Sequence, residues 1–147
     1  LMFNRQIGDK FFEGINLGNM GDLYHILGDF SEARSHLQQA IPICDETILF
    51  AAGAFRGSLA LIHAKQGYLE EALTLIDIGE PQAAAYPVEH GLFLCKKARV
   101  LHLARRPAEA REALAQAQSI AVELKSTSDS GLAKMISETE EFLGEES

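Results

Sequence analysis

Apolar residues recur at intervals of three and four along most of the chain, which is the spacing of amphipathic helices. Two such stripes flank Gly28 and Asp29. Gly28 can end a helix in the left-handed conformation, and Asp29 with Glu32 resembles a capping box that opens the next helix. The pattern therefore predicts two helices joined by a tight turn. Their apolar positions are Leu17, Met20, Gly21, Tyr24 and Leu27, then Phe30, Ala33, Leu37, Ala40 and Ile41.

The same plan occurs three times along the chain. Ala33, Ala72 and Ala110 mark corresponding positions at intervals of 39 and 38 residues, and a glutamate precedes each alanine. In the third unit Arg105 stands where the others have glycine, so either a strained Arg105 or a different turn is expected there. Pro107 suits the first turn of the following helix. We expect three two-helix units that stack on one another.

Small residues recur at fixed places in these units. Gly14, Gly53 and Gly91 each lie 19 residues before the alanine of their unit. Glycine inside a helix costs roughly 1 kcal/mol relative to alanine, so its recurrence indicates either a helix boundary or a close contact. Small side chains let antiparallel helices approach closely. This explains why the chain is rich in regularly spaced Gly and Ala residues although they form no evident catalytic or metal site.

The predicted organisation is a single domain that ends in a capping helix. The cap is predicted from an apolar stripe of Leu132, Met135, Ile136, Phe142 and Leu143. A free amphipathic helix that docks on another protein is the alternative. The expected segments are the end of a preceding helix at 1–9, units at 10–47, 48–85 and 86–126, and the capping helix at 128–144.

The N-terminal end carries apolar residues that we expect to be exposed. Leu1, Met2, Phe3 and Ile7 have the pattern of a last helical turn without its partner helix, and Phe11 and Phe12 follow. The prediction is a homodimer through this end. The alternative is that these side chains fold back on the first unit.

Composition narrows the class of partner. The chain has 147 residues and a formal net charge of −8, which opposes broad contact with nucleic acid or anionic membranes. No apolar run approaches the length of a membrane span. Cys44 and Cys95 have neither metal-site spacing nor the density of a disulfide scaffold, which favours a reducing, cytoplasmic location.

The residues that could carry chemistry do not form a known catalytic or metal motif. The five histidines include no HExxH pattern, so neither a metal site nor a cofactor is predicted. Cys95, Arg99 and His102 share one helical face and could suggest a thiolate with a base, but a cysteine acting as a small core residue is the favoured interpretation. The sequence predicts a protein that is not an enzyme.

The first unit resembles the tetratricopeptide repeat, and the other two match that pattern more weakly. The units are 38 to 39 residues long rather than roughly 34, and Asp45 stands where the family has proline, so longer helices are expected. The resemblance implies an all-α, right-handed α-solenoid, similar to the C-terminal arrays of large bacterial signalling proteins. The residues that carry it are Leu17, Met20, Gly21, Tyr24, Ala33, Leu37 and Ala40.

The resemblance implies a scaffold for protein binding, with a concave groove formed by the first helix of each unit. Two functions remain open: binding of a peptide or partner helix in that groove, or a structural, dimerising or autoinhibitory role beside a fused kinase, cyclase or ATPase-type regulator. We expect an acidic group of the peptide near Lys96 and Arg99; the alternative is that these two side chains belong to a solvated helix face. The groove is predicted at the positions 14, 11 and 8 residues before the alanine of each unit, which include Ala64, and at Lys65 beside Ala64. The candidate groove residues are Asn19, Asp22, His25, Ser58, Leu61, Lys65, Lys96, Arg99 and His102.

Overall fold

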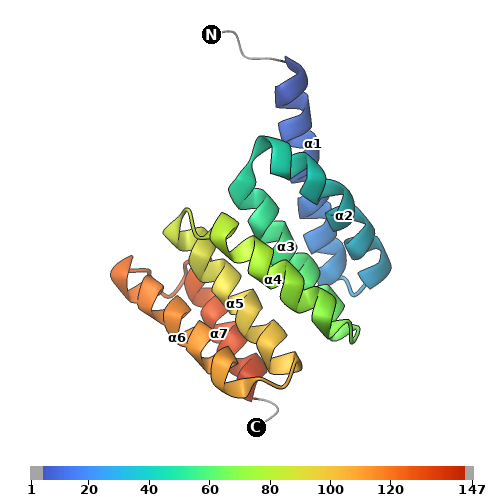
Figure 1. Cartoon of the computed structure of the whole chain (residues 1–147). Helices are drawn as coiled ribbons and strands as arrows, with labels where there is room; N and C mark the ends of the chain where they lie inside the picture. Colours follow the sequence, from blue (N-terminus) through green and yellow to red (C-terminus); the bar gives the residue numbers. More distant parts are fainter. Residues whose placement is uncertain (1–4, 145–147) are drawn as a thin grey trace.

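The computed structural model describes residues 5–144, and within that range the protein is all-α (Figure 1). This confirms the predicted fold class and the longer helices. Among the described residues no helix has the length and apolar character needed to cross a membrane. The seven helices of this range are α1 (Arg5–Ile26), α2 (Phe30–Thr47), α3 (Leu49–Lys65), α4 (Leu69–Ala83), α5 (Pro87–Leu103), α6 (Pro107–Glu123) and α7 (Gly131–Gly144).

The helices pack as consecutive pairs that stack into a solenoid. The closest partners are α1 with α2, α3 with α4, and α5 with α6. The first helix of each pair also contacts the first helix of the next pair, and α7 continues this row by packing on α5. The row α1, α3, α5 and α7 forms one side of the molecule, and we call it the inner row.

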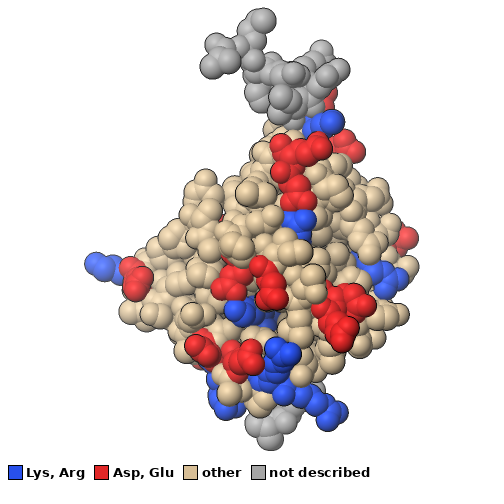
Figure 2. Space-filling view, viewed as in Figure 1, with Lys and Arg blue, Asp and Glu red and all other residues tan. Residues whose placement is uncertain are grey.

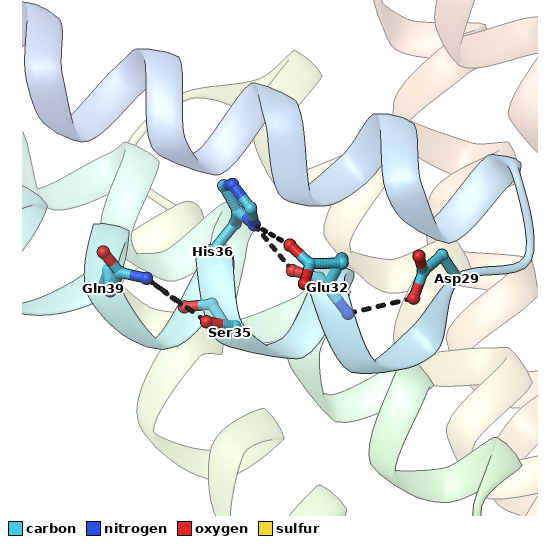
Figure 3. Close-up of polar contacts among 5 residues, drawn as sticks. All are labelled: Asp29, Glu32, Ser35, His36 and Gln39. Atoms are coloured by element: carbon cyan, nitrogen blue, oxygen red, sulfur yellow. Dashed lines mark hydrogen bonds and ion pairs between the residues drawn. The ribbon is translucent and has the colours of Figure 1, made fainter.

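Local hydrogen bonds fix the start of α2. Asp29 Oδ1 accepts a hydrogen bond from the Glu32 backbone N–H at 3.1 Å, so the predicted N-cap is confirmed (Figure 3). His36 Nδ1 lies 2.7 Å from the Glu32 carbonyl oxygen, and the ring points toward α1. One turn later Gln39 Nε2 donates to the Ser35 hydroxyl. These contacts stabilise α2 from its first turn onward.

The turns inside the three pairs share a left-handed residue. Gly28 and Gly67 have φ of +83° and +90°, and Arg105 adopts the same region with φ of +62°. The strained turn expected at Arg105 is confirmed, and it costs about 1 kcal/mol relative to glycine. Pro107 then begins α6, where its missing N–H has no helical acceptor in any case.

The expectation of a separate helix end at 1–9 is wrong for residues 5–9, which belong to α1 without a break. Gly8 is the weakest helix former in that stretch, and one glycine does not end a helix. Leu1, Met2 and Phe3 lie outside the described residues, as does the side chain of Ile7. The homodimer therefore stays a prediction.

The apolar stripe predicted for α1 is only partly buried. Met20 and Leu27 are 44% and 68% exposed, whereas Gly14, Gly18 and Gly21 are buried. The reason is that α1 has neighbours only on the side of α2 and α3 among the described helices, and it approaches them through its glycine face.

The recurring Gly14, Gly53 and Gly91 lie inside helices, so they mark close contacts rather than boundaries. A Cβ on Gly53 would lie 2.7 Å from the Ala83 backbone nitrogen and from the Gly79 carbonyl oxygen. Gly14 and Gly53 bring the two helices of one pair together, whereas the closest neighbour of Gly91 is Leu132 of α7.

A second set of small residues controls the spacing between units. A Cβ on Gly18 would lie 2.1 Å from the ring of Phe55, and a Cβ on Gly57 would lie 3.0 Å from the ring of Phe93. Each phenylalanine belongs to the next helix of the inner row. At the corresponding position of α5 the residue is Cys95, which belongs to the same buried cluster as Leu132 and Ile136 of α7.

Ion pairs also join consecutive units. Arg56 of α3 binds Asp45 of α2 in a bidentate pair, with Nη1–Oδ1 and Nη2–Oδ2 distances of 2.6 and 2.7 Å. At the position where the repeat family has proline, Asp45 therefore makes a contact to the next unit. Lys97 of α5 makes the comparable link to Glu80 of α4 at 2.6 Å.

The final helix covers the last pair. α7 begins at Gly131 rather than 128, because Lys125 has φ of +55° and Ser130 Oγ accepts the Ala133 N–H at 3.0 Å. Leu132 and Ile136 are buried against α5 and α6. α7 thus has the position of the predicted capping helix.

Gly18→Ala should lower the free energy of unfolding by about 1–3 kcal/mol, because the added methyl group overlaps the buried Phe55 ring. Gly131→Ala is the matched control, since a Cβ there meets no atom within 4 Å. Urea denaturation followed by circular dichroism measures both. Equal stabilities of the two variants would contradict the close contact.

Removal of residues 128–147 should lower the melting temperature by at least about 5 °C, because Leu132 and Ile136 lose their buried positions and uncover the face of α5 and α6. A chain that ends at Gly144 serves as the control. Differential scanning calorimetry makes the comparison, and an unchanged melting temperature would favour a freely docking α7.

Candidate functional site

The inner row encloses a cavity of about 460 Å³ to which all four of its helices contribute. Seven of the nine predicted groove residues lie together in its lining. They are Asp22 and His25 of α1, Ser58, Leu61 and Lys65 of α3, and Lys96 and Arg99 of α5.

The other two predicted residues lie elsewhere. Asn19 is exposed on α1 and does not line the cavity. His102 lines a second cavity between α5, α6 and α7, with its ring 5.7 Å from that of Phe142. The counted position Ala64 is buried, and its neighbour Lys65 faces the cavity instead.

Three lining residues escaped prediction, namely Ile26, Met135 and Glu138. Met135 belongs to the apolar stripe that predicts the capping helix, and Glu138 lies outside that stripe. A separation of three residues puts them on neighbouring sites of a helix, which is a signal that they share a surface. The sequence does not show that this surface faces the inner row.

Arg99 is held mainly by α7. Its Nε donates to Thr139 Oγ1 at 3.3 Å, and its guanidinium lies 5.5 Å from the centre of the Phe142 ring. Its Nη2 lies 3.6 Å from Met135 Sδ and 3.7 Å from Glu138 Oε2. The capping helix therefore fixes the guanidinium at one edge of the cavity.

Lys96 lies half-buried between α3 and α5. Its Nζ donates to Ser58 Oγ at 2.9 Å and to the Ala54 carbonyl oxygen at 3.3 Å. Burial lowers the pKa of Lys96 from its ordinary value, and the charges of Asp22 and Glu89 oppose that shift. Its hydrogen-bond acceptors are neutral groups.

Lys65 interacts with a neutral histidine on the first helix. Its Nζ lies 2.9 Å from His25 Nε2, which accepts the hydrogen bond when the ring is unprotonated. Burial, together with the nearby charges of Lys65, Lys96 and Arg99, lowers the pKa of His25 to about 4. The pKa of Lys65 is lowered by burial and by Arg99.

The cavity is a cationic site in an acidic chain. Lys65, Lys96 and Arg99 face two carboxylates, Asp22 and Glu138, while the whole chain carries −8. Within residues 5–144, Lys65 and Lys96 form no ion pair with a carboxylate. On the face drawn in Figure 2, by contrast, acidic and basic side chains are interspersed.

The structure does not favour Cys95 as a nucleophile. Cys95 is fully buried, and burial raises the pKa of its thiol, so a reactive thiolate is not favoured. The interpretation of Cys95 as a small core residue is confirmed. Across the described part of the chain, no three His, Cys, Asp or Glu side chains are grouped to hold a metal ion.

Comparison with known families decides what the helix pairs are. Two family profiles, both described as tetratricopeptide repeat, match residues 16–44 and 53–77. The chain is a tetratricopeptide repeat protein. No curated protein and no solved structure matches it significantly. Tetratricopeptide repeats are non-catalytic scaffolds that generally mediate protein–protein interaction, so the cavity lies on a repeat surface of a protein-binding family.

In this tetratricopeptide repeat protein His25 should titrate near pH 4, and Lys65→Met should raise its pKa toward 6.5 by removing a neighbouring charge. The free energy of unfolding should fall as the pH falls from 6.5 toward 4, because over that range the unfolded chain binds a proton that the folded His25 does not. Proton NMR of the imidazole ring measures the pKa in both proteins, and urea denaturation at several pH values measures the free energy of unfolding. Titration of His25 near 6.5 in the unsubstituted protein would contradict this environment.

Proposed function

We propose that the protein is an interaction module that binds an extended peptide along the inner row, with an acidic side chain of the peptide in the cavity. One observation carries the proposal. Lys65 and Lys96 present ammonium groups at a cavity surface without a carboxylate partner in residues 5–144. An incoming carboxylate would supply the missing counter-charge.

The surroundings of the lysines suit a peptide. Leu61, Ile26 and Met135 add apolar surface beside the charged groups. A volume of about 460 Å³ is within the range of ligand sites and accommodates a side chain with its flanking backbone. Apolar contact supports affinity, while the cations select the acidic residue.

The partial desolvation of the lysines strengthens this selection. Burial lowers the pKa of both Lys65 and Lys96, so removal of their charge from water has a cost in the free protein. A bound carboxylate offsets that cost, because opposite charges attract more strongly at a partly desolvated site. We place this activity in the cytoplasm, since Cys44 and Cys95 are free and buried.

A second function is favoured by a different surface. Phe12, Met20 and Leu23 of α1, and Leu27 directly after it, leave exposed apolar side chains. Such a surface suits a structural, dimerising or autoinhibitory contact within a larger bacterial signalling protein, which could carry a kinase, cyclase or ATPase-type regulator. This role uses the outer side of α1 and not the cavity.

The double substitution Lys65→Met with Lys96→Met should weaken binding of an acidic peptide about five- to tenfold by removing both unpaired cations. The probe is a capped, extended peptide with a central Glu, and its Gln counterpart measures binding without the charge. NMR titration at about 50 mM and about 300 mM salt should show a steeper salt dependence for the unsubstituted protein.

The matched control is Lys10→Met with Lys134→Met, which makes the same change in net charge at two exposed lysines outside the cavity. This variant should bind the Glu peptide as the unsubstituted protein does, apart from a small general charge effect. If both double variants lose affinity equally, or if the Gln peptide binds as well as the Glu peptide, the cavity is not the acidic-peptide site.

A further inference from the structure

The cavity contains a carboxylate supplied by the capping helix. Glu138 of α7 lines it beside Met135, and its Oε2 lies 3.7 Å from Arg99 Nη2. The chain thus places one of its own acidic groups next to the cations that we assign to an acidic ligand. This position calls for an explanation, because a negative charge there opposes a negatively charged ligand.

Glu138 is not needed to hold Arg99 in place. The guanidinium is fixed by Thr139 Oγ1 at 3.3 Å and by the Phe142 ring at 5.5 Å. The side chain of Arg99 is 16% exposed, whereas that of Glu138 is 66% exposed. Glu138 is therefore a loosely held counter-ion of an arginine that is positioned by other contacts.

The three cations consequently differ in how far their positive charge is already compensated by a carboxylate of the chain. Arg99 has a carboxylate nearby in Glu138, whereas Lys65 and Lys96 bind a histidine nitrogen and a hydroxyl oxygen. A first acidic group gains most at the two lysines. A second acidic group toward Arg99 would meet the negative charge of Glu138.

We propose that Glu138 sets how many negative charges the cavity accepts, so that it favours a peptide with one acidic side chain over a peptide with two. The inference rests on the proposed binding of an acidic peptide and names the class of ligand. Glu138 acts as a specificity-determining residue: it neutralises Arg99 within the chain and repels a second carboxylate.

The test compares Glu138→Gln with Glu141→Gln. Both substitutions remove one negative charge from the exposed side of α7, but Glu141 does not line the cavity. The probes are three capped peptides of one length: an uncharged peptide with central Gln, a peptide with one Glu, and a peptide with two Glu residues two positions apart. That spacing puts both side chains on one side of an extended peptide.

For the unsubstituted protein and for Glu141→Gln, the first Glu should tighten binding and the second should change affinity less than about twofold. For Glu138→Gln, the second Glu should add about two- to fivefold in affinity, because Arg99 no longer has its own carboxylate. NMR titration gives the ratio of the two dissociation constants for each protein. Glu138→Ala, which removes the polar group entirely, should give the same ratio as Glu138→Gln.

The outcomes separate this inference from the proposed function. If the one-Glu peptide binds better than the Gln peptide but Glu138→Gln gives the same ratio as Glu141→Gln, charge selection by Glu138 is overturned and peptide binding stands. If no protein of the set prefers a Glu peptide to the Gln peptide, both proposals are overturned.

Discussion

The contact between the Phe55 ring and Gly18 fixes the distance between the first two helices of the inner row. The ring occupies the volume that a Cβ on residue 18 would fill, and Phe93 uses Gly57 in the same way one unit later. Packing of this kind tolerates little change in volume. The polar contacts of the cavity depend on it, because His25 and Lys65 meet across α1 and α3, and Ser58 and Lys96 meet across α3 and α5.

This spacing brings positive charges together in a chain that is acidic overall. The cost of partly burying Lys65, Lys96 and Arg99 near one another appears as a lowered pKa of His25 and of both lysines. The proposed binding of an anionic group would offset that cost. The interior of the stack contributes the free energy of folding through small and apolar residues, and the inner row carries the charges proposed to select a ligand.

Much of the architecture follows from a repeat that the sequence displays. The alanine period predicts three helix pairs, and fixed offsets from each alanine place Asp22, Ser58 and Lys96 on one face. Gly18 and Gly57 also lie at matching distances from the alanine of their unit, but the sequence does not indicate that each one receives a phenylalanine from the next helix. The contribution of Glu138 depends on how α7 docks on α5, about 40 residues away from Arg99, and local periodicity carries no information on that contact. The expected helix end at 1–9 differs from the continuous start of α1, because a cluster of apolar residues by itself does not distinguish a helix end from a helix that continues.

The most direct test of the account is the pKa of His25 in folded Gly18→Ala, measured by NMR titration of the imidazole ring. If Phe55 on Gly18 sets the spacing of the inner row, the added methyl group should move α1 and α3 apart, lengthen the 2.9 Å contact between His25 and Lys65, and raise the pKa from about 4 toward 6.5. A folded Gly18→Ala variant in which His25 still titrates near 4 would contradict the claim that this contact positions the cavity.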